Sequence, residues 1–297
     1  MNMNFTKDPK SKEENDKNPI IFIDGSYYCF YRYHATLTWW KFAYPELELG
    51  DPFLNPEFVD KFRKLFIEGV ASLPRKLRLP KETTVIVGRD CKRADIWRHE
   101  FAQQYKGTRP SNNDLKEGQT IFYGCSFFMM VYKDELFLKG GAKLVIVHNK
   151  LEGDDVIAIS VKRILNDDPN RKIVVITSDK DYLQLLQPSG NVSLYNASLK
   201  NIGLTKDGLM IDGRKELFVK TVMGDKSDNI LPVLSKCGYK TAEKCYHDPV
   251  YFESRLTKEN AHQVYLNNKK MIDFDEIPSN LVEEFWSEYG AKVVGLV

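Results

Sequence analysis

Residues 19–28 read PIIFIDGSYY, an apolar run rich in β-branched residues that ends at an aspartate, Asp24. The same order recurs in residues 83–90, TTVIVGRD, and in residues 174–183, VVITSDKDYL. Short apolar runs separated by helical stretches are typical of parallel strands that are covered on both faces. We therefore predict an α/β fold with a mainly parallel sheet flanked by helices. The predicted strands are residues 20–23, 84–87, 144–147 and 173–176.

The pattern changes twice along the chain and predicts three parts. Residues 1–18 are polar without periodicity, so we expect a disordered tail. Residues 19–212 hold the alternating strands and helices, with a long, charged, glycine-punctuated insertion at about residues 91–141. Residues 213–297 are helical in pattern. The predicted helices are residues 57–73, 156–165, 215–223, 241–246, 249–256 and 281–289.

Composition bounds the class of protein. The chain has 297 residues, of which 42% are hydrophobic and 28% charged, values typical of a globular protein. Its five cysteines form no CxxC pair, which argues against a disulfide framework or a zinc site and favours a reducing compartment. We find no signal peptide and no apolar stretch of the roughly 20 residues that span a bilayer. We expect a cytoplasmic protein with no membrane partner.

Nine carboxylates, in five short clusters, follow the ends of apolar runs. Taken singly, each cluster has an ordinary explanation as a helix cap or a surface turn. Together they would meet at the carboxyl edge of a parallel sheet, where so many charges stay close only if cations neutralise them. Ligands that are all oxygen favour Mg²⁺, with Mn²⁺ as a substitute. The nine are Asp24, Asp90, Glu152, Asp154, Asp155, Asp179, Asp181, Asp225 and Asp228.

Residues 97–110, WRHEFAQQYKGTRP, contain a cationic pair. Lys106 and Arg109 are three residues apart and follow Tyr105. A lysine and an arginine beside an acid cluster are what phosphoryl transfer requires, because cations stabilise the charge that develops on the phosphate. The alternative is a solvated helix end.

Five segments, in this order, resemble the 5′-nuclease (flap endonuclease) superfamily, which includes the 5′-nuclease domain of bacterial DNA polymerase I and phage 5′-exonucleases. The similarity extends from about residue 20 to about residue 289, and residues 269–286, KKMIDFDEIPSNLVEEFW, take part in it. The segments are IDGSYYCFYR, RDCKRADIWRHEFAQQYKGTRP, EGDDVIA, TSDKDYLQL and GDKSDNI.

The resemblance implies a PIN-like nuclease core with a mixed sheet and two metal positions. Lys106 and Arg109 would stand at the base of a helical arch, and Arg32 would contact phosphate. Asp24, Asp90, Glu152 and Asp154 would surround the first Mg²⁺ ion. Asp155, Asp179, Asp181, Asp225 and Asp228 would shape the second site, some of them through water.

The same resemblance makes the region after Asp225 a helix-turn-helix variant that binds duplex DNA. Relatives often carry a glycine-rich turn there, whereas residues 231–244 read LPVLSKCGYKTAEK and keep only Gly238. Whether a monovalent-cation site exists near residues 231–240 stays open. The candidate nucleic-acid contacts are Arg32, Tyr105 (by stacking), Lys236, Lys240 and Lys244.

The predicted function is metal-dependent hydrolysis of phosphodiester bonds at the 5′ ends of duplexes, removing primers and flaps during DNA replication. The expected partners are branched or nicked duplex DNA and RNA–DNA hybrid, bound by a monomer. A single-strand-binding protein and a sliding clamp are candidate protein partners. The location would be the host cytoplasm, if the chain is a phage protein, or the nucleoid. The sequence leaves open whether the protein acts mainly as an exonuclease or as an endonuclease. It also leaves open whether the cleaved strand is preferably RNA or DNA. The alternatives are a PIN-type single-strand RNase and a non-catalytic flap-DNA-binding protein.

Overall fold

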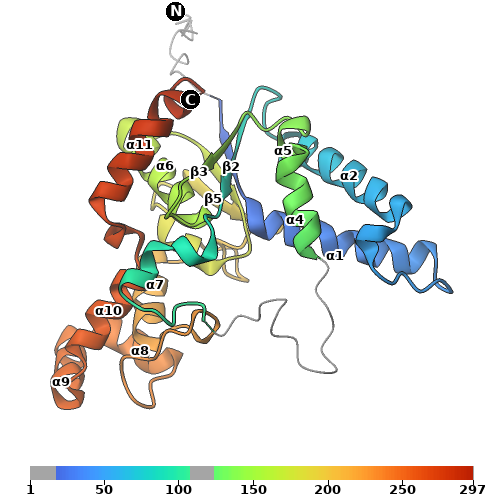
Figure 1. The fold of residues 1–297 in the computed structure, drawn as a ribbon. Helices are drawn as coiled ribbons and strands as arrows, with labels where there is room; N and C mark the ends of the chain where they lie inside the picture. Colours follow the sequence, from blue (N-terminus) through green and yellow to red (C-terminus); the bar gives the residue numbers. More distant parts are fainter. Residues whose placement is uncertain (1–17, 108–123, 297) are drawn as a thin grey trace, which may run out of the picture.

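The structure is a computed structural model that describes residues 18–107 and 124–296, which leaves nearly all of the predicted tail outside the described residues. A five-stranded sheet with the order β3-β2-β1-β4-β5 lies at its centre (Figure 1). All four strand pairs are parallel. The strands are β1 (Ile20–Asp24), β2 (Thr84–Arg89), β3 (Leu144–Val147), β4 (Ile173–Ile176) and β5 (Val192–Tyr195).

The strands are apolar on both sides because helices cover both faces of the sheet. In β1, Ile20 and Phe22 pack into one core cluster, whereas Ile21 and Ile23 pack into the other. Side chains alternate between the two faces of a strand, so a doubly covered sheet needs a continuous apolar run.

Two groups of helices build these covers (Figure 1). One face packs against α6 (Gly153–Asp167) and α11 (Ser279–Val294), with Phe285 fully buried between them and the sheet. The other face packs against α1 and α2 and against three shorter helices. This second group comprises α1 (Gly25–Ala43), α2 (Pro56–Ala71), α3 (Leu73–Lys76), α4 (Gly124–Lys133) and α5 (Leu136–Lys139).

Four further helices form a smaller helical region beyond the carboxyl edge of the sheet (Figure 1). Val219, Val222, Leu234 and Ala242 are among the residues of its own apolar cluster. The helices are α7 (Gly213–Met223), α8 (Tyr239–His247), α9 (Pro249–Glu259) and α10 (His262–Ile272). Short 3₁₀ helices connect the larger elements: η1 (Pro52–Leu54), η2 (Arg93–Asp95), η3 (Trp97–Glu100), η4 (Lys180–Leu185), η5 (Lys226–Asp228) and η6 (Phe274–Glu276).

The predicted fold class is confirmed, and the four predicted strands coincide with β1 to β4. Strand β5 and helices α3, α4, α5 and α10 were not predicted. In the predicted insertion, α4 packs into the core, where Phe127 and Val131 are fully buried. Residues 108–123 of that insertion lie outside the described residues. In the part of the chain that the structure describes, no helix has the length and apolar character to cross a bilayer.

Candidate active site

Strand ends bring the first acids to the carboxyl edge of the sheet. Asp24 ends β1 and caps α1 by accepting the backbone N–H of Tyr27, while the hydroxyl of Thr177 donates to its other oxygen at 3.0 Å. Asp90 follows β2 and accepts the backbone N–H of Gly153 at 2.6 Å. Burial, and then the nearby charge of Asp90, raise the pKa of Asp24 to about 7. The Asp24 carboxylate is therefore held in a site that disfavours its own charge.

The first turn of α6 contributes three more acids. Glu152 and Asp155 form a reciprocal capping box, in which the backbone N–H of Glu152 donates to Asp155 at 3.1 Å. One ligand oxygen from each of Glu152, Asp154 and Asp155 lies within 4.8 Å of the others, which makes this a group that could hold a metal ion. Burial and the charges of Asp155 and Glu152 raise the pKa of Asp154 well above its ordinary value. Helix capping and acid clustering therefore occur together at this turn.

A second group of acids lies around Lys220 of α7. The backbone N–H of Asp179 donates to Thr177, the residue that also bonds Asp24, and Asp179 in turn caps η4 by accepting the backbone N–H of Asp181. The ammonium group of Lys220 contacts Asp181 and lies 2.8 Å from Asp225. Burial alone would raise the pKa of Asp225, but the hydrogen bonds from Lys220 and Ser227 and the charge of Lys220 together outweigh it and lower that pKa to about 2.

Lys106 connects the two groups. Its backbone N–H donates to the carbonyl of Asp228 at 2.9 Å, and its ammonium group lies 2.5 Å from Glu152. Burial lowers the pKa of Lys106, but the charges of Glu152, Asp154 and Asp228 raise it further, so the net shift is upward. Hydrogen bonds, ion pairs and chain neighbours thus join all nine predicted acids into one acid cluster at the carboxyl edge of the sheet.

The parallel sheet between its helices and the acid cluster at its carboxyl edge can now be compared with known proteins. Residues 19–214 match the family described as the 5′-3′ exonuclease, N-terminal resolvase-like domain. The chain belongs to this family. Its function is that of a 5′-nuclease, as the sequence predicted.

Individual relatives agree with this membership. The ribonuclease H of Enterobacteria phage T4 is 26% identical over an alignment of 245 residues, and the match covers 77% of each of the two chains. The solved structure of the T5 5′-exonuclease with divalent zinc ions superimposes with a TM-score of 0.64 at 18% identity, covering 94% of this nuclease and 99% of that chain. The T5 D15 flap endonuclease, in a complex with DNA and metal ions, gives a TM-score of 0.62 at 16% identity, with 94% and 98% covered. The two structural likenesses show a shared fold.

The donor set of this 5′-nuclease fits hard divalent ions. The cluster offers carboxylate oxygens, and burial, together with repulsion between neighbouring acids, raises the pKa values of Asp24, Asp154 and Asp181. The hydroxyl of Tyr182 is fully buried and finds no hydrogen-bond partner among the described residues. Burial and the charges of Asp24, Asp154 and Asp179 raise the pKa of this phenol, which places it near the acids. An excess of buried negative charge and an unpartnered hydroxyl are what a hydrated cation would satisfy.

Two of the predicted nucleic-acid contacts, Arg32 and Tyr105, bond to groups inside the protein. Arg32 sits between α1 and α2, and its guanidinium donates to the carbonyl of Leu65, because that helix interface offers a buried acceptor. Tyr105 was expected to stack on bases, but it is only 4% exposed and donates its hydroxyl to Glu152 at 3.1 Å. Arg109 lies outside the described residues.

The other three predicted contacts are on the surface of the helical region. Lys240 and Lys244 are exposed and lie four residues apart on α8, so they share one face of that helix. Lys236 is exposed in the turn before α8, with a left-handed φ of 48°. The arrangement leaves all three ammonium groups accessible to a phosphate backbone.

Sequence reasoning missed Arg98, Trp97 and Lys220. Arg98 is 2% exposed and contacts both Glu152 and Asp155, while the indole N–H of Trp97 donates to Asp155 at 2.9 Å. Residues 97–100 read WRHE, which alone suggests a polar surface turn. The one available signal was Trp97, since a large apolar residue beside an arginine is compatible with burial of both.

Proposed function

We propose that this 5′-nuclease uses two Mg²⁺ ions to hydrolyse phosphodiester bonds at the 5′ ends of RNA–DNA and DNA duplexes. The biological role would be the removal of primers and flaps during DNA replication. The observation that carries the proposal is the single acid cluster, which gathers acids from the end of β1, from the residues that follow β2 and β4, and from the turns at α6, η4 and η5. The printed activities of the relatives, ribonuclease H and flap endonuclease, agree with it.

The acids divide into two groups by position. Asp90, Glu152 and Asp154 lie at the first turn of α6 and, with Asp24 at the end of β1, would hold the first ion. Asp179, Asp181, Asp225 and Asp228 lie on the side of Lys220 and would hold the second. When bound, two such ions supply an activated water and stabilise the charge on the leaving oxygen.

The chain's own cations would act on the substrate. The ammonium group of Lys106 pairs with Glu152, and the Lys106 side chain is 13% exposed, so this group would lie at the rim of the cluster, within reach of a scissile phosphate. Released from Glu152, it would stabilise negative charge on that phosphate. Arg109 is three residues further along the chain and is proposed for the same role.

The helical region would hold the duplex. We propose that residues 213–297 contribute this region, with Lys236, Lys240 and Lys244 contacting backbone phosphates. Contacts of this kind carry no sequence information, so the nuclease would select its substrate by shape and bind more weakly as salt rises.

Cleavage of a labelled 5′-flap duplex tests the proposal directly. Wild-type protein should cleave it with Mg²⁺ and not with EDTA, and Asp154→Ala should lose cleavage while retaining its fold. Asp154 is suitable because Glu152 and Asp155 cap α6 without it. Asp60→Ala, whose side chain is 79% exposed, is the matched control and should cleave normally. Full activity of Asp154→Ala would contradict the assignment of this acid to the first ion.

Two controls address the alternatives. Preferential cleavage of unpaired RNA over the flap duplex would favour a PIN-type RNase. Flap binding without cleavage in Mg²⁺ or Mn²⁺ would favour a non-catalytic binding protein. The lengths of the products, compared for RNA and DNA 5′ strands, would separate exonuclease from endonuclease action.

A further inference from the structure

Arg98 is a buried arginine in contact with the acid cluster. It lies in η3 and is 2% exposed, so it is shielded from solvent. The central carbon of its guanidinium lies over the ring of Trp97, 4.6 Å from the ring centroid. An arginine buried this deeply is stable only when its N–H donors are satisfied, because an unpaired buried charge is strongly unfavourable.

The guanidinium bonds two acids at the same time. One of its terminal nitrogens donates to Glu152 at 3.1 Å and to Asp155 at 2.8 Å, and the other donates to Asp155 at 2.8 Å. Asp155 also accepts from the indole of Trp97 and from the backbone N–H of Glu152. Both oxygens of Asp155 are therefore already used within the protein. Asp155 was predicted to help shape the second metal site, but its geometry suits holding Arg98 and Glu152 in place.

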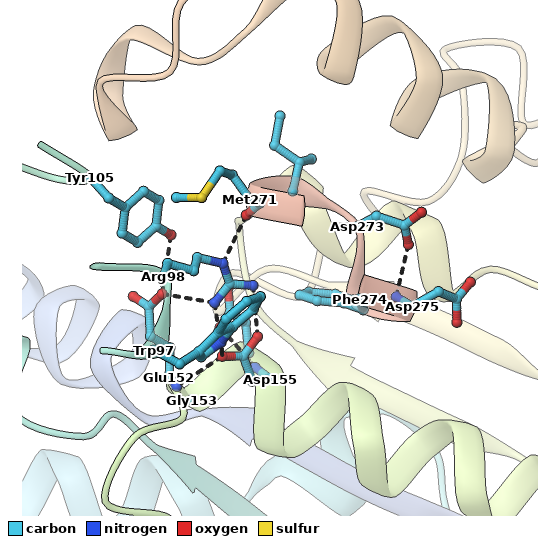
Figure 2. A network of polar contacts seen from close by, with 12 residues as sticks. Trp97, Arg98, Tyr105, Glu152, Gly153, Asp155, Met271, Asp273, Phe274 and Asp275 are labelled. Atoms are coloured by element: carbon cyan, nitrogen blue, oxygen red, sulfur yellow. Dashed lines mark hydrogen bonds and ion pairs between the residues drawn. The ribbon is translucent and has the colours of Figure 1, made fainter. Parts of the chain in front are cut away.

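A further donor of Arg98 reaches the helical region. Its Nε–H donates to the carbonyl of Met271 in the last turn of α10, at 2.8 Å. Figure 2 shows the guanidinium lying between this carbonyl on one side and Glu152 and Asp155 on the other. The neighbouring residue Ile272 is fixed in a similar way, because Gln184 donates to its carbonyl at 3.1 Å. Arg98 is thus a direct link from the end of α10 to the turn that carries Glu152.

We propose that Arg98 is a positioning residue for the nuclease reaction, one that orients Glu152 through Asp155 and fastens the acid cluster to the end of α10. This inference rests on the proposed function, since it assumes that Glu152 binds a divalent ion. Groups that orient metal ligands typically change metal affinity by about 10–100-fold when they are replaced. Arg98 would therefore set the affinity of the cluster without touching the ion.

Arg98→Lys is the discriminating variant. It keeps the positive charge and keeps Asp155, but one ammonium group cannot make the paired bonds to Asp155 while also bonding Glu152 and Met271. Mn²⁺ binding, measured by calorimetry without DNA, should weaken by roughly 10-fold or more. If Asp155 were a direct ligand and Arg98 only a neighbouring charge, the variant would bind Mn²⁺ as tightly as the wild type, and the inference would be refuted.

A second readout separates positioning from general loss of stability. In Arg98→Lys, hydrogen exchange should accelerate at the end of α10 and the start of α6, with α9 unaffected. Uniform acceleration over the whole chain would instead indicate a purely structural role. Arg255→Lys is the matched control, because Arg255 also makes several bonds, to Glu259, Tyr251 and Ser235, all of them in the helical region. This control should leave Mn²⁺ affinity unchanged.

A double variant covers the case in which Arg98→Lys does not fold. Arg98→Met with Asp155→Leu replaces the ion pair by apolar groups and leaves the net charge unchanged, a replacement that buried ion pairs often tolerate. It should fold and still bind Mn²⁺ at least about 10-fold more weakly, because Glu152 loses its contacts with Arg98 and Asp155 and keeps only those with Tyr105 and Lys106. If the folded double variant bound Mn²⁺ as tightly as the wild type, this inference would be overturned and the proposed function would stand. Absence of Mn²⁺ binding by the wild type would instead overturn the proposed function.

Discussion

Replacing Asp24 by asparagine should stabilise the metal-free protein, although Asp24 is a proposed metal ligand. The folded structure raises the pKa of this acid from 3.8 to about 7, through burial and the charge of Asp90. Above pH 7 the folded protein must therefore keep a carboxylate charged in a site that favours the neutral form. Asparagine has the same shape, and its carbonyl oxygen can still cap α1 through Tyr27.

The magnitude follows from the pKa difference. About three pKa units at roughly 1.36 kcal/mol each give about 4 kcal/mol at pH 8. Because the Asp24 side chain is partly exposed, solvent screening reduces this value, and we expect about 2 kcal/mol. The folded state binds the extra proton, so the penalty is absent below pH 4, grows between pH 4 and pH 7, and is complete above pH 7. At pH 5 the advantage of Asp24→Asn should fall to about a third of its value at pH 8.

Thermal unfolding in EDTA at pH 5 and pH 8 measures this effect. At pH 8 the midpoint of Asp24→Asn should exceed that of the wild type by about 4 °C. Added Mn²⁺ should raise the midpoint of the wild type more than that of the variant, because the ion relieves the same repulsion. Asp60→Asn is the control, since the side chain of Asp60 is 79% exposed. A metal-free variant that is less stable than the wild type at pH 8 would refute the reasoning.

Three more predictions test other parts of the structure. In Lys220→Met, the two carboxylates that Lys220 contacts lose an internal competitor for a metal ion, so calorimetry should show tighter Mn²⁺ binding; weaker binding would count against this view. Gly25→Ala should lower the free energy of unfolding in urea by about 1–3 kcal/mol, because its new Cβ would lie 2.6 Å from a backbone carbonyl of β2. Gly238→Ala is the control, and it should be near neutral because the space around Gly238 is open. In Lys240→Gln with Lys244→Gln, the slope of log affinity for duplex DNA against log salt should shrink by about 0.9 for each lost phosphate contact, and an unchanged slope would remove α8 from the interface.

The sequence predicted the sheet and its acids because both depend on local pattern. Residues 20–23 and 173–176 are uninterrupted apolar runs, and Asp24 and Asp179 follow them within three residues. Strand β5, with the sequence VSLY, is short and alternates, so it does not stand out from a loop. The local pattern of helix α1 is weak, because its aromatic and β-branched residues have modest helix propensity and its stability comes from packing against α2 and α4.

The partners of each acid could not be predicted in the same way. Local sequence places Asp155 beside Asp154, but only the tertiary structure shows that Arg98 and Trp97 occupy its oxygens. Likewise, nothing near Lys220 in the sequence indicates that it contacts Asp181, which is 39 residues away. Ion pairs between distant segments depend on how helices pack, and that information is spread over the whole core.

The position of α11 limits how this nuclease can be divided. Leu281, Phe285 and Val293 of α11 are buried in the same core cluster as α6, the helix whose first turn carries Glu152. A fragment that stopped at residue 214, the end of the family match, would leave that side of α6 open to water. Truncations, and chimeras that exchange the helices α7 to α10, should therefore retain α11. Without α11 they would lose the packing that supports α6 and the acids at its first turn.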